Sequence, residues 1–102
     1  MRLHVMLSLD FSDAKENRYS FNKFLEAKGW EKLTAVDTVW HREFGYSQSN
    51  AYLVAHTLEK DLTDAAKEFK PHSIEYVAQI GNAAPIKCGV VKKPAGYEHV
   101  TR

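Results

Sequence analysis

The residue in this sequence that is best placed for chemistry is Asp10, which ends an apolar stretch, Leu3–Asp10, near the start of the chain. Loops at the ends of strands hold functional side chains on a rigid scaffold, so an acid at this point is a candidate metal ligand or general base. Ser8 lies two residues earlier and, in a strand, points to the same face, where it could bind a metal ion or orient a water. The alternative interpretation is that Asp10 caps the turn into a following helix.

Basic and nucleophilic side chains add weaker signals. Arg18 could bind a phosphate from a helix, and His41 and Arg42 could line a nucleic-acid groove beside a hairpin. An arginine on a helix is more often solvated or ion-paired. The only cysteine, Cys88, excludes an intrachain disulfide and the paired-cysteine spacing of zinc sites, and with no histidine partner placed for it we expect a buried residue.

Composition limits the protein to one domain with one core. The chain has 102 residues, of which 44% are hydrophobic, and its formal net charge is +1. Such a balance predicts no large basic face, so any contact with nucleic acid must use a local patch, a dimer groove or a metal ion.

Hydrophobic periodicity predicts five strands and two helices. A helix begins at Ser12 or Asp13 and ends at Gly29 and Trp30, where a glycine followed by an aromatic residue is typical of a Schellman stop. A second helix covers 58–69. The expected strands are Leu3–Asp10, Lys32–Phe44, Ala51–Thr57, Ser73–Ile80 and a short fifth strand, Ile86–Lys93.

The order of these elements predicts an α+β fold, a ferredoxin-like βαββαβ sandwich. It has a four-stranded antiparallel sheet, in which Lys32–Phe44 and Ala51–Thr57 form a hairpin, two helices on one face, and the short C-terminal fifth strand. Residues 1–93 form the domain and residues 94–102 a flexible tail. One sheet face is left open around His4 and Met6, and we expect a homodimer to cover it.

The expected compartment is the cytoplasm, with no membrane contact. The single cysteine suits a reducing environment, and no apolar run reaches the roughly 20 residues that a membrane span needs. The first residues read as a buried strand and not as a signal peptide.

The first 44 residues resemble a known superfamily. Its members begin with an apolar strand that ends in an aspartate, here Asp10, followed by a helix with an early arginine, here Arg18. A Leu-x-x-x-Gly-aromatic stop follows, here Leu25–Trp30, and then a strand ending in Val-aromatic, here Val39–Trp40. On these motifs the chain resembles the small ferredoxin-fold nucleases of CRISPR adaptation, the virulence-associated D ribonucleases and the GhoS-type antitoxin endoribonucleases.

This resemblance implies a metal-dependent activity. The strand-end aspartates of two protomers would approach one another across a dimer interface and share a divalent ion, Mg²⁺, with Asp10 as the catalytic residue and Asp10 and Ser8 as its ligands. Carboxylates and hydroxyls are the oxygen ligands that such a hard cation prefers.

Three hypotheses about function remain open at this stage. The first is a magnesium-dependent endoribonuclease, or an RNA- or DNA-binding protein, of a CRISPR-adaptation or toxin–antitoxin type system. The second is a non-catalytic protein-binding module of the same fold, such as an antitoxin, a phage-encoded inhibitor or an assembly subunit. The third is a small-ligand sensor that uses the dimer face.

Overall fold

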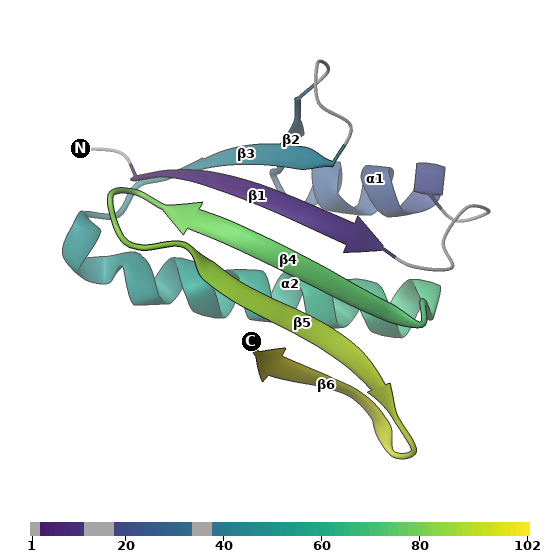
Figure 1. The fold of residues 1–102 in the computed structure, drawn as a ribbon. Helices are drawn as coiled ribbons and strands as arrows, with labels where there is room; N and C mark the ends of the chain where they lie inside the picture. The colour runs from purple at the N-terminus through teal and green to yellow at the C-terminus, as the bar shows by residue number, and fades with distance from the viewer. Residues whose placement is uncertain (1–2, 12–17, 34–37) are drawn as a thin grey trace.

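The computed structural model describes residues 3–11, 18–33 and 38–102, which form one antiparallel sheet of six strands with two helices over one of its faces (Figure 1). The strands are β1 (Leu3–Phe11), β2 (Glu31–Lys32), β3 (Val39–Phe44), β4 (Ser73–Ile80), β5 (Ile86–Lys93) and β6 (Gly96–Thr101). The helices are α1 (Arg18–Ala27) and α2 (Ala51–Phe69), and a short 3₁₀ turn, η2 (Gln48–Asn50), leads into α2.

The strands lie in the order β2-β3-β1-β4-β5-β6, so the first strand of the chain sits inside the sheet, between β3 and β4. Elements β1 to β4 follow one another with their helices as β-α-β-β-α-β. Strands β5 and β6 then extend the sheet beyond β4, and Figure 1 shows them as two further antiparallel strands on that side.

Burial alternates along β1 and thereby defines the two faces of the sheet. The odd-numbered residues of β1, from Leu3 to Phe11, are all buried against the helices, while the even-numbered residues are all exposed. Strict alternation is what a strand shows when only one of its faces is covered. We call the other face, which points away from the helices, the open face.

The end of α1 follows the sequence signal closely. Gly29 has a φ of +100°, the Trp30 amide donates to the carbonyl of Leu25 at 3.1 Å, and the Gly29 amide donates to that of Glu26 at 3.0 Å. These two bonds are the pair that defines a Schellman motif, so the predicted stop is confirmed. The predicted start of the helix, at Ser12 or Asp13, lies outside the described residues.

The predicted four-stranded sheet with a short fifth strand is wrong, because the sheet described here has six strands. Two segments were misassigned. The stretch predicted as one strand, Lys32–Phe44, contributes instead to two strands, β2 and β3, which pair with each other. Residues Ala51–Thr57, predicted as the other strand of a hairpin, form the first turns of α2.

Residues Ala51–Thr57 have a clear physical reason to be helical. Val54, Leu58 and Leu62 recur at intervals of four residues and are all fully buried, and no glycine or proline interrupts the 19 residues of the helix. A strand over 51–57 would have directed Val54 to the face opposite Leu53 and Ala55, whereas the helix places Val54 on one stripe with Leu58.

The segment expected to be a flexible tail, 94–102, contains β6. Its residues pair with β5 from Lys93↔Gly96 to Cys88↔Thr101. Two side chains of β6 bind to other parts of the domain: the Tyr97 hydroxyl donates to the Pro71 carbonyl at 2.6 Å, and His99 Nε2 lies 2.6 Å from the hydroxyl of the buried Tyr76. Among the described residues, no helix is long and apolar enough to cross a membrane.

We predict that β6 contributes to the stability of the whole domain. Deletion of residues 94–102 should lower the free energy of unfolding by at least about 2 kcal/mol, because the buried Tyr76 hydroxyl loses its bond to His99 and the Tyr97–Pro71 bond is also lost. Urea unfolding of the full chain and the deletion variant measures this difference, and hydrogen exchange should show protected β6 amides in the full chain. Equal unfolding midpoints together with unprotected amides would instead support a flexible tail.

Candidate functional site

Asp10 lies on the open face directly opposite a second acid, Glu75 on β4. Residues paired in this way across an antiparallel sheet have Cβ atoms about 4.5–5.5 Å apart, so the two acidic side chains leave the sheet side by side within one chain. Ser8 lies on the same face of β1, opposite Val77. The structure therefore brings the two predicted metal ligands, Asp10 and Ser8, to one surface and adds an acid that sequence reasoning missed.

The carboxylate of Glu75 is held in place by Arg102. Arg102 donates from Nε to Glu75 Oε1 at 3.0 Å and from Nη2 to Oε2 at 2.7 Å, which is a two-pronged pair. The Arg102 amide also donates to the Lys87 carbonyl at 2.8 Å, and this fixes the backbone beside the pair. Hydrogen bonding from Arg102, together with its positive charge, lowers the pKa of Glu75 below its ordinary value.

Gly89 leaves space for the Glu75 carboxylate. Gly89 pairs with Glu75 across β4 and β5, and a Cβ placed on Gly89 would lie 2.7 Å from Glu75 Oε2. Any other residue at position 89 would push the carboxylate away from its present position. Gly89 is therefore part of what allows Glu75 to extend over β5 toward Arg102.

These groups surround a shallow depression of about 400 Å³ on the open face. Its lining includes two acids, two cationic side chains and a hydroxyl: Asp10, Glu75, Lys87, Arg102 and Ser8. The carboxylates and the hydroxyl offer oxygen ligands to a hard cation, and the cationic side chains offer partners to a phosphate. Together these two kinds of group could hold a metal ion against a phosphate ester.

Arg42, predicted to bind nucleic acid, lies on the other side of the sheet. Its Nη1 is 3.7 Å from Oδ2 of the buried Asp61 on α2, and its guanidinium lies 4.4 Å from the ring centre of Phe44. The same Asp61 oxygen accepts a hydrogen bond from Trp30 Nε1 at 3.3 Å. Burial raises the pKa of Asp61, an effect that Trp30, Lys28 and Arg42 oppose. In this structure Arg42 joins the sheet to α2.

His41, a second predicted nucleic-acid ligand, lies apart from the depression. His41 lies on the open face of β3, where it pairs with Met6 of β1. Met6 is four residues from Asp10 along β1, which is about 13 Å. Arg18 is the first residue of α1, whose helix covers the opposite face, and its side chain lies outside the described part. Of the predicted site residues whose side chains the structure describes, only Ser8 and Asp10 lie together in the depression.

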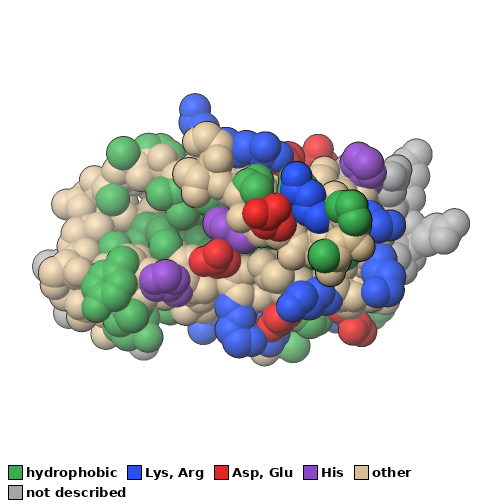
Figure 2. Space-filling model, turned by 90° about the horizontal axis from the view of Figure 1, so that it is seen from below, with side chains coloured by type: hydrophobic (Ala, Val, Ile, Leu, Met, Phe, Trp, Pro, Cys, Tyr) green, Lys and Arg blue, Asp and Glu red, His purple; other side chains and the backbone are tan. Residues whose placement is uncertain are grey.

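A second polar group joins α2 to β6. His99 Nδ1 is 3.3 Å from Glu59 Oε1, while its Nε2 meets the Tyr76 hydroxyl. Burial raises the pKa of the Tyr76 hydroxyl, which shares a hydrogen bond with His99. Figure 2 views the molecule from the side of β6; charged side chains gather in the centre and right half, with smaller hydrophobic patches among them, and the largest hydrophobic patch lies in the left half. The contacts of His99 with Glu59 and Tyr76 thus form the polar part of the packing of β6 against the rest of the domain.

Comparisons of the chain with protein-family models, curated protein sequences and solved structures find no match. The resemblance to the CRISPR-adaptation and toxin–antitoxin ribonucleases therefore rests on the motifs of the sequence and stays a prediction.

We predict that Asp61 matters more to stability than its helix neighbour Asp64. Asp61→Ala should lower the free energy of unfolding by about 1–3 kcal/mol, because the buried Trp30 Nε1–H loses its acceptor and Arg42 its counter-charge. Asp64→Ala is the matched control, since Asp64 pairs at the surface with Lys60 at 2.7 Å and its loss should change stability by about 0.5 kcal/mol or less. Equal effects in urea unfolding would contradict a special role for Asp61.

We also predict that Arg102 controls the protonation of Glu75. Arg102→Ala should raise the pKa of Glu75 toward its ordinary value, as followed by carboxyl-carbon NMR titration. A carboxyl whose pKa is lowered by folding stabilises the fold above its unfolded-state pKa, and this contribution disappears as the pH falls through its folded-state value. The stability difference between the variant and the unaltered chain should therefore be largest near neutral pH and vanish in acid. Lys60→Ala, at a remote ion pair, should leave the titration of Glu75 unchanged.

Proposed function

We propose that this chain is a divalent-cation-dependent endoribonuclease, of CRISPR-adaptation or toxin–antitoxin type, with its site in the depression around Asp10. One observation carries the proposal. Asp10 and Glu75 lie opposite each other on the open face, with Lys87 and Arg102 lining the same depression. This combination suits a phosphodiester better than it suits an uncharged ligand, because acids and cations line one surface.

Asp10, Glu75 and Ser8 would hold the ion. A carboxylate offers about four lone-pair positions, so Glu75 can bind a cation while it accepts two hydrogen bonds from Arg102. When bound, Mg²⁺ would polarise a phosphoryl oxygen and lower the pKa of a bound water. Lys87 and Arg102 would counter the charge of the phosphate.

A single copy supplies both acids of this proposed site. The resemblance places the second carboxylate in another protomer, whereas here Glu75 of the same chain stands beside Asp10. The predicted homodimer remains a separate proposal. Met6 and Val77 are exposed apolar residues on the open face, at 42% and 41%, and are the residues that an interface through this face would cover.

The test is cleavage of labelled single-stranded RNA, with DNA of the same sequence in parallel, in Mg²⁺, in Mn²⁺ and in a chelator. The unaltered chain should cleave RNA only with the cation present. Asp10→Asn and Glu75→Gln should each lower the rate by at least about 100-fold, since even the outer partners of metal ligands contribute 10–100-fold.

Asp64→Asn, an acid on α2 away from the open face, is the matched control and should keep full activity. All variants are purified by the same procedure, so that a contaminating nuclease would give the same activity in each preparation. Cleavage that survives Asp10→Asn, or that needs no cation, would overturn the proposed mechanism. Absence of cleavage by the unaltered chain would favour the non-catalytic protein-binding module.

A further inference from the structure

Three potential nitrogen and oxygen ligands meet at the other end of the open face. They are His4 on β1 and His41 and Glu43 on β3. The register pairs His4 with Glu43 and Met6 with His41, so the three side chains occupy three corners of one cross-strand rectangle and Met6 occupies the fourth. Side chains at such corners are close enough to contact one another.

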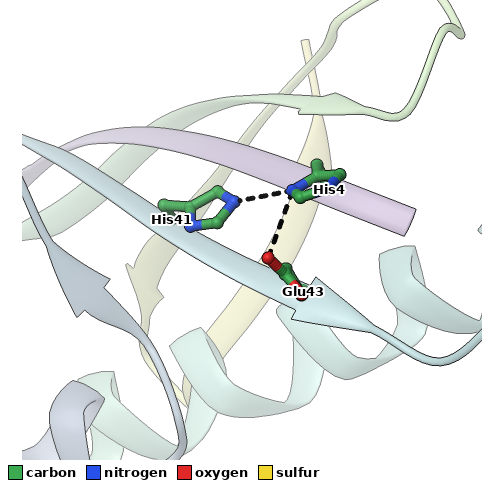
Figure 3. Close-up of side chains that lie close together, drawn as sticks. All are labelled: His4, His41 and Glu43. Atoms are coloured by element: carbon green, nitrogen blue, oxygen red, sulfur yellow. Dashed lines mark hydrogen bonds and ion pairs between the residues drawn. The ribbon is translucent and has the colours of Figure 1, made fainter. Parts of the chain in front are cut away.

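The three ligand atoms converge, as Figure 3 shows. His4 Nδ1 is 3.1 Å from His41 Nε2 and 3.7 Å from Glu43 Oε1, and all three atoms lie within 4.8 Å of one another. Ligand atoms bound to one tetrahedral zinc ion at about 2.0–2.2 Å are roughly 3.3–3.6 Å apart. The distances observed here bracket that range, so an ion would require only small side-chain movements.

The contact between the two histidines has a chemical consequence. Two neutral imidazole nitrogens can face each other at 3.1 Å only if one of them carries a proton, because two lone pairs would repel. A metal ion can take the place of that proton and accept both lone pairs. The carboxylate of Glu43 then supplies a third donor and a negative charge.

We propose that His4, His41 and Glu43 bind a borderline divalent transition metal ion, with Zn²⁺ as the ion of choice. Imidazole nitrogens select such ions over Mg²⁺, which prefers oxygen ligands. The site is therefore chemically distinct from the depression around Asp10. Since its ligands come from two strands, the ion would also link β1 to β3.

Three protein ligands leave one position of a tetrahedral ion for water or a small anion. His4 and Met6 also line an adjoining depression of about 420 Å³, together with Tyr46, Gln48, Gln79 and Asn82. An external ligand could reach the fourth position from this side. The side chain of His4 is 62% exposed and that of Glu43 42% exposed, so the ion would be accessible to chelators.

The experiment is titration of the untagged, metal-free full chain with Zn²⁺ by calorimetry, with Mg²⁺ as a comparison. One Zn²⁺ ion should bind per chain, Mg²⁺ should not compete, and excess Zn²⁺ should raise the melting temperature by about 5 °C or more. His4→Ala, His41→Gln and Glu43→Gln should each weaken binding by at least about tenfold.

His56→Ala is the matched control, because His56 is an exposed histidine on α2 that also lies beside an acid, Glu59. Its removal should leave Zn²⁺ affinity unchanged. Imidazole ¹⁵N NMR of the unaltered chain identifies the ligands without any variant. Zn²⁺ should change the ¹⁵N chemical shifts of Nδ1 of His4 and Nε2 of His41. Shifts at other histidines instead, or an affinity unaffected by His4→Ala and His41→Gln, would overturn the proposal.

Discussion

The alternation of β1 is the constraint on which the rest of this structure depends. Because β1 lies between β3 and β4, its odd-numbered side chains must fill the core beneath three strands, and its even-numbered side chains must lie on the open face. His4, Ser8 and Asp10 are therefore brought to one surface by the burial of Val5, Leu7 and Leu9. A slip of one residue in the register would exchange the two sets, so the core itself fixes the position of the candidate site.

Two acid–arginine pairs lie on opposite sides of the sheet, and their different burial gives them different roles. Asp61 and Arg42 lie between the sheet and α2, where the acid also accepts from a buried indole, and they join two layers. Glu75 and Arg102 lie on the open face, where solvent and a ligand can reach them. The second pair exists only because β5 and β6 extend the sheet past β4 and carry Gly89 and Arg102 to Glu75.

The sequence predicted best those features that depend on neighbouring residues. The Schellman end of α1 and the bounds of β4 and β5 follow from local pattern alone. Residues 51–57 were misread because a short apolar run fits both a strand and a helix, although the recurrence of Val54, Leu58 and Leu62 favoured the helix. Asp10 and Ser8 could be selected from the sequence, but Glu75 could not, since its place opposite Asp10 depends on a register between segments far apart in the chain. A signal for β6 was present in the alternation of Tyr97, His99 and Thr101 after Pro94–Gly96.

The central place of β1 also has a consequence for synthesis. Leu7 pairs with Ala78, a partner 78 − 7 = 71 positions later in the chain. A nascent polypeptide must therefore carry an apolar segment with an unpaired edge until β4 leaves the ribosome. Such non-local pairing slows folding and leaves time for association with other molecules, so a chaperone that shields the first residues would be expected to increase the yield of folded protein.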